Sequence, residues 1–132
     1  MIRRFGYGKR AMPDLDALEA FIAAVESGKH DEAIACFYTD DASMQDNLGP
    51  LRKGKDNLIA RERQFMMQFK EIRSKCVRPA FVAGDRVVIC WNFEFVSQDG
   101  SVWTMDELAY QRWEGNRVAE ERFYYDPSQI TL

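Results

Sequence analysis

The hydrophobic and polar positions follow two different periods along this chain. In the first half, apolar residues recur at the spacing of one helix face, and polar residues that can cap a helix precede each run. We predict a first helix that Asp14 caps and Ser27–Gly28 ends, and a second helix that Asp31 caps. A third helix begins after Asp56 and runs to about Phe69.

The second half of the chain has the pattern of strands. From Ile72 onward, β-rich runs alternate with glycine turns, which indicates successive hairpins. The turns are Ala83–Asp85, Gln98–Gly100 and Glu114–Asn116, and the strands are predicted over residues 72–82, 86–98, 101–113 and 117–125. Strands of this length must twist, so we expect a strongly curved antiparallel sheet with helices packed on its concave side. The predicted fold class is α+β, a cone-shaped barrel whose open end leaves an apolar pocket.

A short strand is predicted between the second and third helices. The stretch Ala42–Pro50, ASMQDNLGP, alternates in polarity and then ends in a turn. Asp46 shares the alternation phase of Met44, so its carboxylate is expected to face the interior. The alternative is that Asp46 caps the backbone amides of Asn47–Gly49, which is a common role of Asp at the start of a loop.

Composition and charge narrow the class of protein. The chain has 132 residues, which is typical of one domain, and we expect that domain to span 14–132 after a disordered leader at 1–13. The net charge of -3 gives no reason to expect nucleic acid or an anionic membrane as a partner. With one histidine and three cysteines lacking metal-ligand spacing, no metal site is expected. The odd cysteine count suggests reduced thiols in a cytoplasmic protein.

Two stretches carry a resemblance to a known family. The order of elements, together with FYTDDASMQDNLGPLRKGKDNL and YQRWEGNRVAEERFYYD, resembles the SnoaL-like branch of the nuclear transport factor 2-like superfamily over about residues 14–126. That resemblance implies the fold. It implies the activity only loosely, because the superfamily includes isomerases, cyclases, epoxide hydrolases, dehydratases and binding domains.

The ketosteroid isomerases of that superfamily provide a comparison residue by residue. The resemblance places Asp46 where those enzymes have their general base. It places Phe21 and Ala109 where they have the two donors that stabilise the enolate oxygen. Neither Phe nor Ala can donate a side-chain hydrogen bond, which argues against ketosteroid isomerisation itself.

The resemblance implies that Phe21, Trp91 and Phe93 face the pocket. Strand alternation, with Asp46 and Ala109 taken as inward positions, assigns the other side chains. The expected apolar wall consists of Phe21, Met44, Trp91, Phe93, Trp103, Met105, Ala109 and Phe123. The expected polar groups are Asp46, Glu107, Glu121 and Tyr125, of which one carboxyl could donate a proton while another accepts one. Two alternatives remain: the aromatic residues fill the core, and Glu107 and Glu121 form ion pairs with Arg112, Arg117 or Arg122.

Three other features are interpreted more simply. His30 lies in the polar stretch SGKHDEA and is expected to be a solvated turn residue. The run Arg52–Lys55 is expected to be a solvated loop, with a role at the pocket mouth as the alternative. The outer face of the sheet would carry Val88, Cys90, Val102, Leu108 and Tyr110, which predicts a homodimer through the convex face.

Two functional hypotheses follow. In the first, the chain is a cofactor-free acid–base enzyme of isomerase, cyclase, hydratase or dehydratase type, with Asp46 as general base or acid. Its substrate would be a small apolar or ring-bearing molecule. In the second, the same pocket belongs to a non-catalytic ligand-binding or dimerisation domain.

Overall fold

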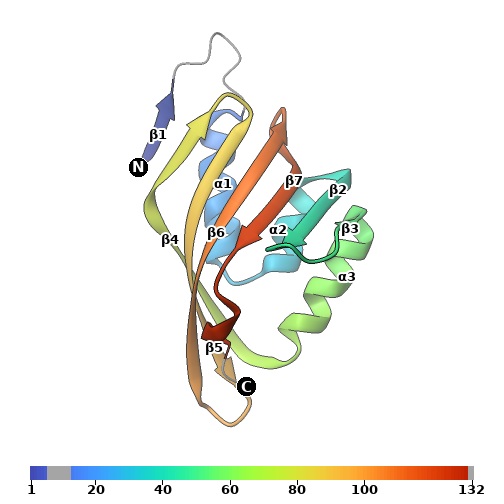
Figure 1. Cartoon of the computed structure of the whole chain (residues 1–132), viewed down its shortest axis with the longest axis vertical. Helices are drawn as coiled ribbons and strands as arrows, with labels where there is room; N and C mark the ends of the chain where they lie inside the picture. The colour runs from blue at the N-terminus through green and yellow to red at the C-terminus, as the bar shows by residue number, and fades with distance from the viewer. Residues whose placement is uncertain (6–12, 131–132) are drawn as a thin grey trace.

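The computed structural model describes residues 1–5 and 13–130 and contains three helices and seven strands (Figure 1). The helices are α1 (Leu15–Glu26), α2 (His30–Phe37) and α3 (Lys55–Met66), and a short 3₁₀ helix, η1, covers Pro127–Gln129. The strands are β1 (Ile2–Phe5), β2 (Tyr38–Asp46), β3 (Arg52–Lys53), β4 (Phe69–Ala83), β5 (Arg86–Ser97), β6 (Val102–Glu114) and β7 (Arg117–Tyr124). The predicted α+β class is confirmed.

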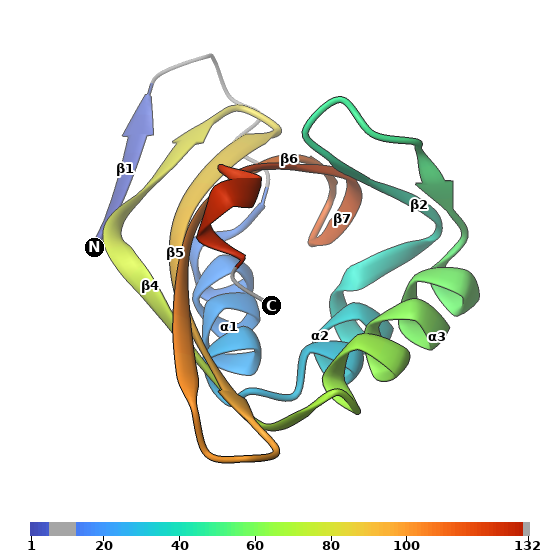
Figure 2. The same ribbon diagram turned by 60° about the horizontal axis from the view of Figure 1, so that its bottom comes forward.

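The sheet differs from the predicted one in two respects. Its strand order is β1-β4-β5-β6-β7-β2-β3, and β1·β4 and β2·β7 are parallel pairs, so the sheet is mixed rather than antiparallel. The mixture arises because both parallel partners come from the N-terminal part of the chain and reach the sheet through long connections. β1 and β3 form its two edges, and the sheet is not as strongly curled as we expected. The helices pack on one face of this sheet (Figure 2).

The first residues of the chain correct another prediction. Ile2–Phe5 was expected to belong to a disordered leader, but it forms β1 and pairs with Ala80–Ala83 of β4. Ile2 is partly buried against the core, which the basic character of its neighbours conceals in the sequence. Residues 6–12 of the expected leader lie outside the described residues.

The helix boundaries agree with the sequence at α1 and differ slightly at the other two. Asp14 precedes α1, but its side chain does not form the predicted cap hydrogen bond. Ser27 follows the helix, and Gly28 has a φ of 85°. A Cβ at Gly28 would lie 2.9 Å from the backbone oxygen of Ile72, so both the space and the conformation require glycine there. α2 begins one residue before Asp31. Asp31 lies in the first turn, where its negative charge interacts favourably with the positive end of the helix dipole.

The third helix is shorter at its C-terminal end than predicted, and the three predicted hairpins are present. α3 begins at Lys55 and ends at Met66, because Phe69 already belongs to β4 and pairs with Ser97 of β5. All three predicted hairpin turns are present, and their glycines have positive φ angles. The hairpins therefore place β4 to β7 side by side in sequence order.

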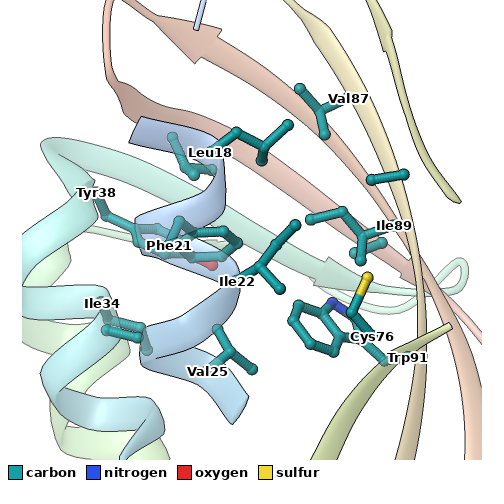
Figure 3. Packing of buried hydrophobic residues seen from close by; sticks show 14 of the residues in the cluster. Leu18, Phe21, Ile22, Val25, Ile34, Tyr38, Cys76, Val87, Ile89 and Trp91 are labelled. Atoms are coloured by element: carbon teal, nitrogen blue, oxygen red, sulfur yellow. The ribbon is translucent and has the colours of Figure 1, made fainter. Parts of the chain in front are cut away.

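The core lies between α1 and the sheet. Figure 3 shows Leu18, Phe21, Ile22 and Val25 of α1 directed toward side chains of the strands, among them Val87, Ile89 and Trp91. The spacing of three and four residues between the four helical positions is what brings them onto one face. Truncation of a fully buried leucine in such a core costs about 2–5 kcal/mol of stability.

A β-bulge in β7 decides which side chains face the helices. Arg112 pairs with Glu120 but Trp113 pairs with Val118, so Ala119 is the extra residue in β7. The bulge lies before Glu121, and the remaining residues of β7 keep the alternation that the sequence predicted.

Candidate active site

A cavity of about 190 Å³ lies between the inner face of the sheet and the helices. The predicted pocket residues line it, with the exception of Ala109, which is fully buried between Ile89 and Phe123 in the sheet register. Its methyl group is too short to reach past these larger neighbours. Trp91 and Trp103 line the cavity and do not fill it. The described lining residues are Phe21, Val25, His30, Ala33, Ile34, Tyr38, Met44, Asp46, Arg52, Glu62, Phe65, Trp91, Phe93, Phe95, Trp103, Met105, Glu107, Glu121, Phe123, Tyr125 and Ile130.

Asp46 lies at the rim of this cavity, at the end of β2. Its register partner is Phe123, so both side chains point to the same face of the sheet. Arg52 donates a hydrogen bond to one carboxylate oxygen at 3.2 Å, and the Tyr125 hydroxyl donates to the other at 3.4 Å. The amide of Gly49 donates to the backbone carbonyl of Asp46, so the carboxylate is not needed to close this turn. The side chain is 41% exposed, which keeps it accessible from solvent.

Glu107 lies deeper in the cavity, on the inner face of β6 opposite Trp91. The residue is only 8% exposed, and among the described residues no side chain forms a hydrogen bond or ion pair with it. Burial raises the pKa of its carboxyl well above the usual value, and the negative charges of Glu121 and Asp46 add to the increase. The protonated form, which can donate a hydrogen bond into the cavity, is therefore more favoured than in a free glutamate.

Glu121 belongs to a buried chain of hydrogen bonds. Tyr38 donates to one of its oxygens, Gln111 donates to the other at 2.6 Å, and Trp113 donates to the Gln111 carbonyl at 2.9 Å. Burial raises the pKa of Glu121 to about 7, although the two hydrogen bonds to its carboxylate oppose the increase. Its proton equilibrium therefore lies close to neutral pH.

Glu107 and Glu121 do not form the ion pairs with arginine that the sequence offered as an alternative. Arg112 pairs with Glu114 and Glu120, at 3.8 Å and 3.3 Å. Arg122 donates to the backbone carbonyl of Asn47 at 2.8 Å. In the described part of the chain, these arginines serve exposed groups and backbone, and Glu107 and Glu121 face inward.

His30 corrects the sequence interpretation, because it lines the cavity and is not a solvated turn residue. Its side chain is 13% exposed, and its ring lies 5.5 Å from that of Phe93. Nδ1 lies 3.2 Å from a Glu62 oxygen and Nε2 lies 2.6 Å from the Ser74 hydroxyl. The bonds join α2, α3 and β4, with partners 32 and 44 residues away, so no local pattern could have indicated them.

The chain Ser74–His30–Glu62 has the connectivity of a nucleophile, a base and an orienting acid. Ser74, however, is not among the residues that line the cavity. Both ring nitrogens of His30 are occupied by protein groups. This arrangement positions Glu62, which does line the cavity, and supplies no accessible nucleophile.

Arg52 and Phe95 also line the cavity without having been predicted to do so. Arg52 was interpreted as part of a solvated loop, with the pocket mouth as the alternative, and β3 pairs it with Met44 beside the cavity. Phe95 stacks on Trp103, with ring centroids 4.3 Å apart. Continuing the alternation of Trp91 and Phe93 by one step would have found Phe95.

Residues 1–5 and 13–130 lack two features. None of the helices there is both long and apolar enough to cross a membrane. No group of three or more His, Cys, Asp or Glu side chains there could hold a metal ion.

Comparison with known proteins places this geometry in context. The SnoaL-like domain matches residues 18–121 of the chain. No curated protein matches its sequence.

Solved structures share the fold at low sequence identity. A hypothetical protein with a ketosteroid isomerase-like fold from Catenulispora acidiphila, in complex with trimethylamine, is 17% identical with a TM-score of 0.74, over 88% of this chain and 89% of that one. A candidate SnoaL-like polyketide cyclase from Jannaschia sp. CCS1 is 12% identical with a TM-score of 0.74, over 92% and 91%. A protein of unknown function from Burkholderia pseudomallei, described as NTF2-like (nuclear transport factor 2-like), is 17% identical with a TM-score of 0.73, over 89% and 97%.

Proposed function

Because the chain belongs to the SnoaL-like domain family, we propose that it is a cofactor-independent acid–base enzyme that acts on a small molecule in the cavity. One observation carries the proposal: two carboxyl groups with opposite surroundings face the same apolar cavity. Asp46 lies beside a guanidinium at the rim, whereas Glu107 is buried and has no partner among the described residues. Such a pair divides the roles of base and acid between two residues of the same type.

In the proposed reaction, the Asp46 carboxylate removes a proton from a carbon next to a carbonyl group. The protonated Glu107 donates a hydrogen bond to the carbonyl oxygen, where negative charge develops. Asp46 then returns the proton to a different carbon, so that an isomerisation balances by proton transfer alone. In a cyclisation, the enolate carbon instead attacks a second carbonyl of the same molecule, and the new alkoxide takes up the proton that Asp46 had removed.

The missing isomerase donors have a substitute in this arrangement. Phe21 and Ala109 cannot donate, but Glu107 lies two residues before Ala109 on the same face of β6. Tyr125 adds a hydroxyl that already reaches Asp46 at 3.4 Å. These groups support enolate stabilisation at a position shifted along β6. The trimethylamine in the Catenulispora relative supports the use of this fold for small-molecule binding.

A second candidate function is a non-catalytic ligand-binding domain. It is favoured by Phe21, which packs against Phe37, Tyr38 and Trp113 in the core and leaves its position without a donor. The two candidates differ in whether a bound molecule exchanges protons.

The proposal is tested by deuterium exchange at carbon. A panel of cyclic ketones and enones is incubated with the protein in D₂O, and loss of the protons next to the carbonyl is followed by NMR. We expect at least one compound to exchange faster than in buffer, and Asp46→Asn to reduce that rate by about 10²–10⁴-fold. Asp41→Asn is the matched control, because Asp41 is an exposed residue of the same strand.

Equal exchange rates in the wild type and in Asp46→Asn would contradict the role of Asp46. If compounds bind but none exchanges faster than in buffer, the binding-domain alternative is favoured.

We also propose that the chain forms a homodimer through the outer face of the sheet. Val77, Cys90, Leu108 and Tyr124 are register partners across β4 to β7 and form one continuous row there. Val102 and Tyr110 extend the apolar surface, and both are exposed. A second copy of the same face would cover this row.

A further inference from the structure

We propose that the ligand of this cavity carries a positive charge, as a substituted ammonium group on an apolar body. The inference rests on the proposed function only in taking the cavity as a small-molecule site. It adds the class of molecule that the site selects.

The charges that line the cavity are strongly unequal. Four carboxyl groups face it, from Asp46, Glu62, Glu107 and Glu121. Among the described lining residues, Arg52 carries the one permanent positive charge, and it is already bonded to Asp46. The ring nitrogens of His30 are likewise engaged, by Glu62 and Ser74. Glu62 and Glu121 are also held, by His30, Tyr38 and Gln111, so a cation would pair with Glu107, whose carboxyl has no partner among the described residues.

Glu107 is the residue that points to a ligand. It is more than nine-tenths buried, it lines the cavity, and no hydrogen bond or ion pair is made to it by the described residues. No described side-chain oxygen or nitrogen is fully buried without a partner, so the Glu107 oxygens are open to the cavity, where a ligand can supply their partner. A substituted ammonium group provides the opposite charge that this carboxyl lacks.

The electrostatic environment of Glu107 also favours a positively charged ligand. Burial is the largest cause of the raised pKa of Glu107. The next causes are the charges of Glu121, Asp46 and Glu62, three other carboxyls of the same lining. Their mutual repulsion favours protonation while the cavity is empty of positive charge. A bound cation would reverse this preference, so Glu107 would release its proton on binding. In such a complex Tyr125, and not Glu107, would donate the hydrogen bond to the carbonyl oxygen.

The apolar walls favour a cation over a neutral molecule of the same shape. Trp91, Phe93, Phe95, Trp103 and Phe65 line the cavity, and their ring faces carry partial negative charge. Two pairs of these rings are stacked, Trp91 with Phe93 and Phe95 with Trp103, which fixes their orientation. Aromatic rings combined with carboxylates form the type of site that recognises substituted ammonium groups.

An anionic ligand fits these observations poorly. It would have Arg52 as its one permanently charged partner in the described lining and would compete with Asp46 for it. Each carboxyl group of the lining that is ionised would repel it at short distance. The same field that disfavours an anion strengthens the binding of a cation.

The test compares two probes of equal shape on the wild-type protein, choline and its carbon isostere 3,3-dimethylbutan-1-ol, by isothermal titration calorimetry. We expect choline to bind about tenfold or more tightly than the neutral isostere. Glu107→Gln should lower the affinity for choline by about tenfold and leave that of the isostere unchanged. Glu120→Gln, an exposed position of β7 that pairs with Arg112, is the matched control.

A second readout uses the proton. Titrations of choline in two buffers with different ionisation enthalpies should show proton release by the wild type and less release by Glu107→Gln. If the isostere binds as tightly as choline, the inference is overturned while the proposed acid–base function stands. If neither probe binds at millimolar concentration, the inference is overturned, and the deuterium exchange experiment decides the proposed function separately.

Discussion

At the scale of single residues, Glu121 shows how the fold adjusts an ionisable group. The carboxyl is 4% exposed and is held by Tyr38 and Gln111, so its oxygens have partners although its charge is poorly solvated. Glu107 is nearly as buried, at 8% exposed, but no described side chain donates a hydrogen bond to its carboxyl. The difference separates a carboxyl that organises the core from one that is available to a ligand.

The raised pKa of Glu121 predicts a dependence of stability on pH. The pKa rises from 4.5 to about 7 on folding, so between these values the folded protein binds more protons than the unfolded chain. The free energy of unfolding therefore decreases as pH rises from about 4.5 to about 7, by about 3 kcal/mol from this residue. Glu121→Gln should remove that part of the decrease, as measured by urea unfolding at a series of pH values.

Two details make this prediction specific. The variant should retain a residual slope of the same sign, because the pKa of Glu107 is also raised. Glu120→Gln, at the neighbouring exposed position, should leave the profile of the wild type unchanged. An unchanged profile in Glu121→Gln would show that Glu121 titrates normally in the folded protein.

At the scale of elements, His30 connects three parts of the fold that the chain separates. Its ring bonds to Glu62 of α3 and Ser74 of β4 from the first turn of α2. Both helices contribute side chains to the cavity lining, among them Ile34 and Phe65. The spacing between Glu62 and the sheet therefore depends on these two contacts.

Removal of one contact should weaken this junction measurably. Ser74→Ala leaves Nε2 of the partly buried His30 without its partner at 2.6 Å, and we expect a loss of about 1–3 kcal/mol in the free energy of unfolding. Ser101→Ala is the control, since its hydroxyl bonds to Asp99 in an exposed turn and should cost less. Chemical unfolding of both variants measures the difference, and equal losses would contradict a special role for the His30 junction.

At the scale of the whole molecule, the two faces of the sheet have different tasks. The inner face encloses the cavity, and the outer face presents a row of apolar residues to solvent. Leu108, near the middle of that row, is 46% exposed. A partner that covers the row would leave the cavity open, because cavity and row lie on opposite faces.

The proposed homodimer is tested at this outer face. Leu108→Glu would place a charge in the centre of the interface, so we expect the variant to be monomeric at micromolar concentration where the wild type is dimeric. Sedimentation velocity distinguishes the two states. Gln64→Glu, an exposed position on α3, is the control for added negative charge. A wild type that sediments as a monomer would contradict the proposal.

The sequence by itself determined the order of most elements, the three hairpins, the family and the face on which most cavity residues lie. These features depend on local periodicity and turn residues, which neighbouring positions specify directly. The alternation that assigned Glu107 and Phe123 to the interior held because the bulge at Ala119 precedes the inward residues of β7.

Only the tertiary structure decided the features that depend on distant residues. β1 joins β4 across more than half of the chain, β2 runs parallel to β7, and His30 finds its partners on α3 and β4. Distant residues also decide that Asp46 has partners and that the Glu107 carboxyl has none within residues 1–5 and 13–130. The physical reason is that a carboxyl group's protonation and role follow from its burial and its neighbours in space, which a period along the chain does not encode.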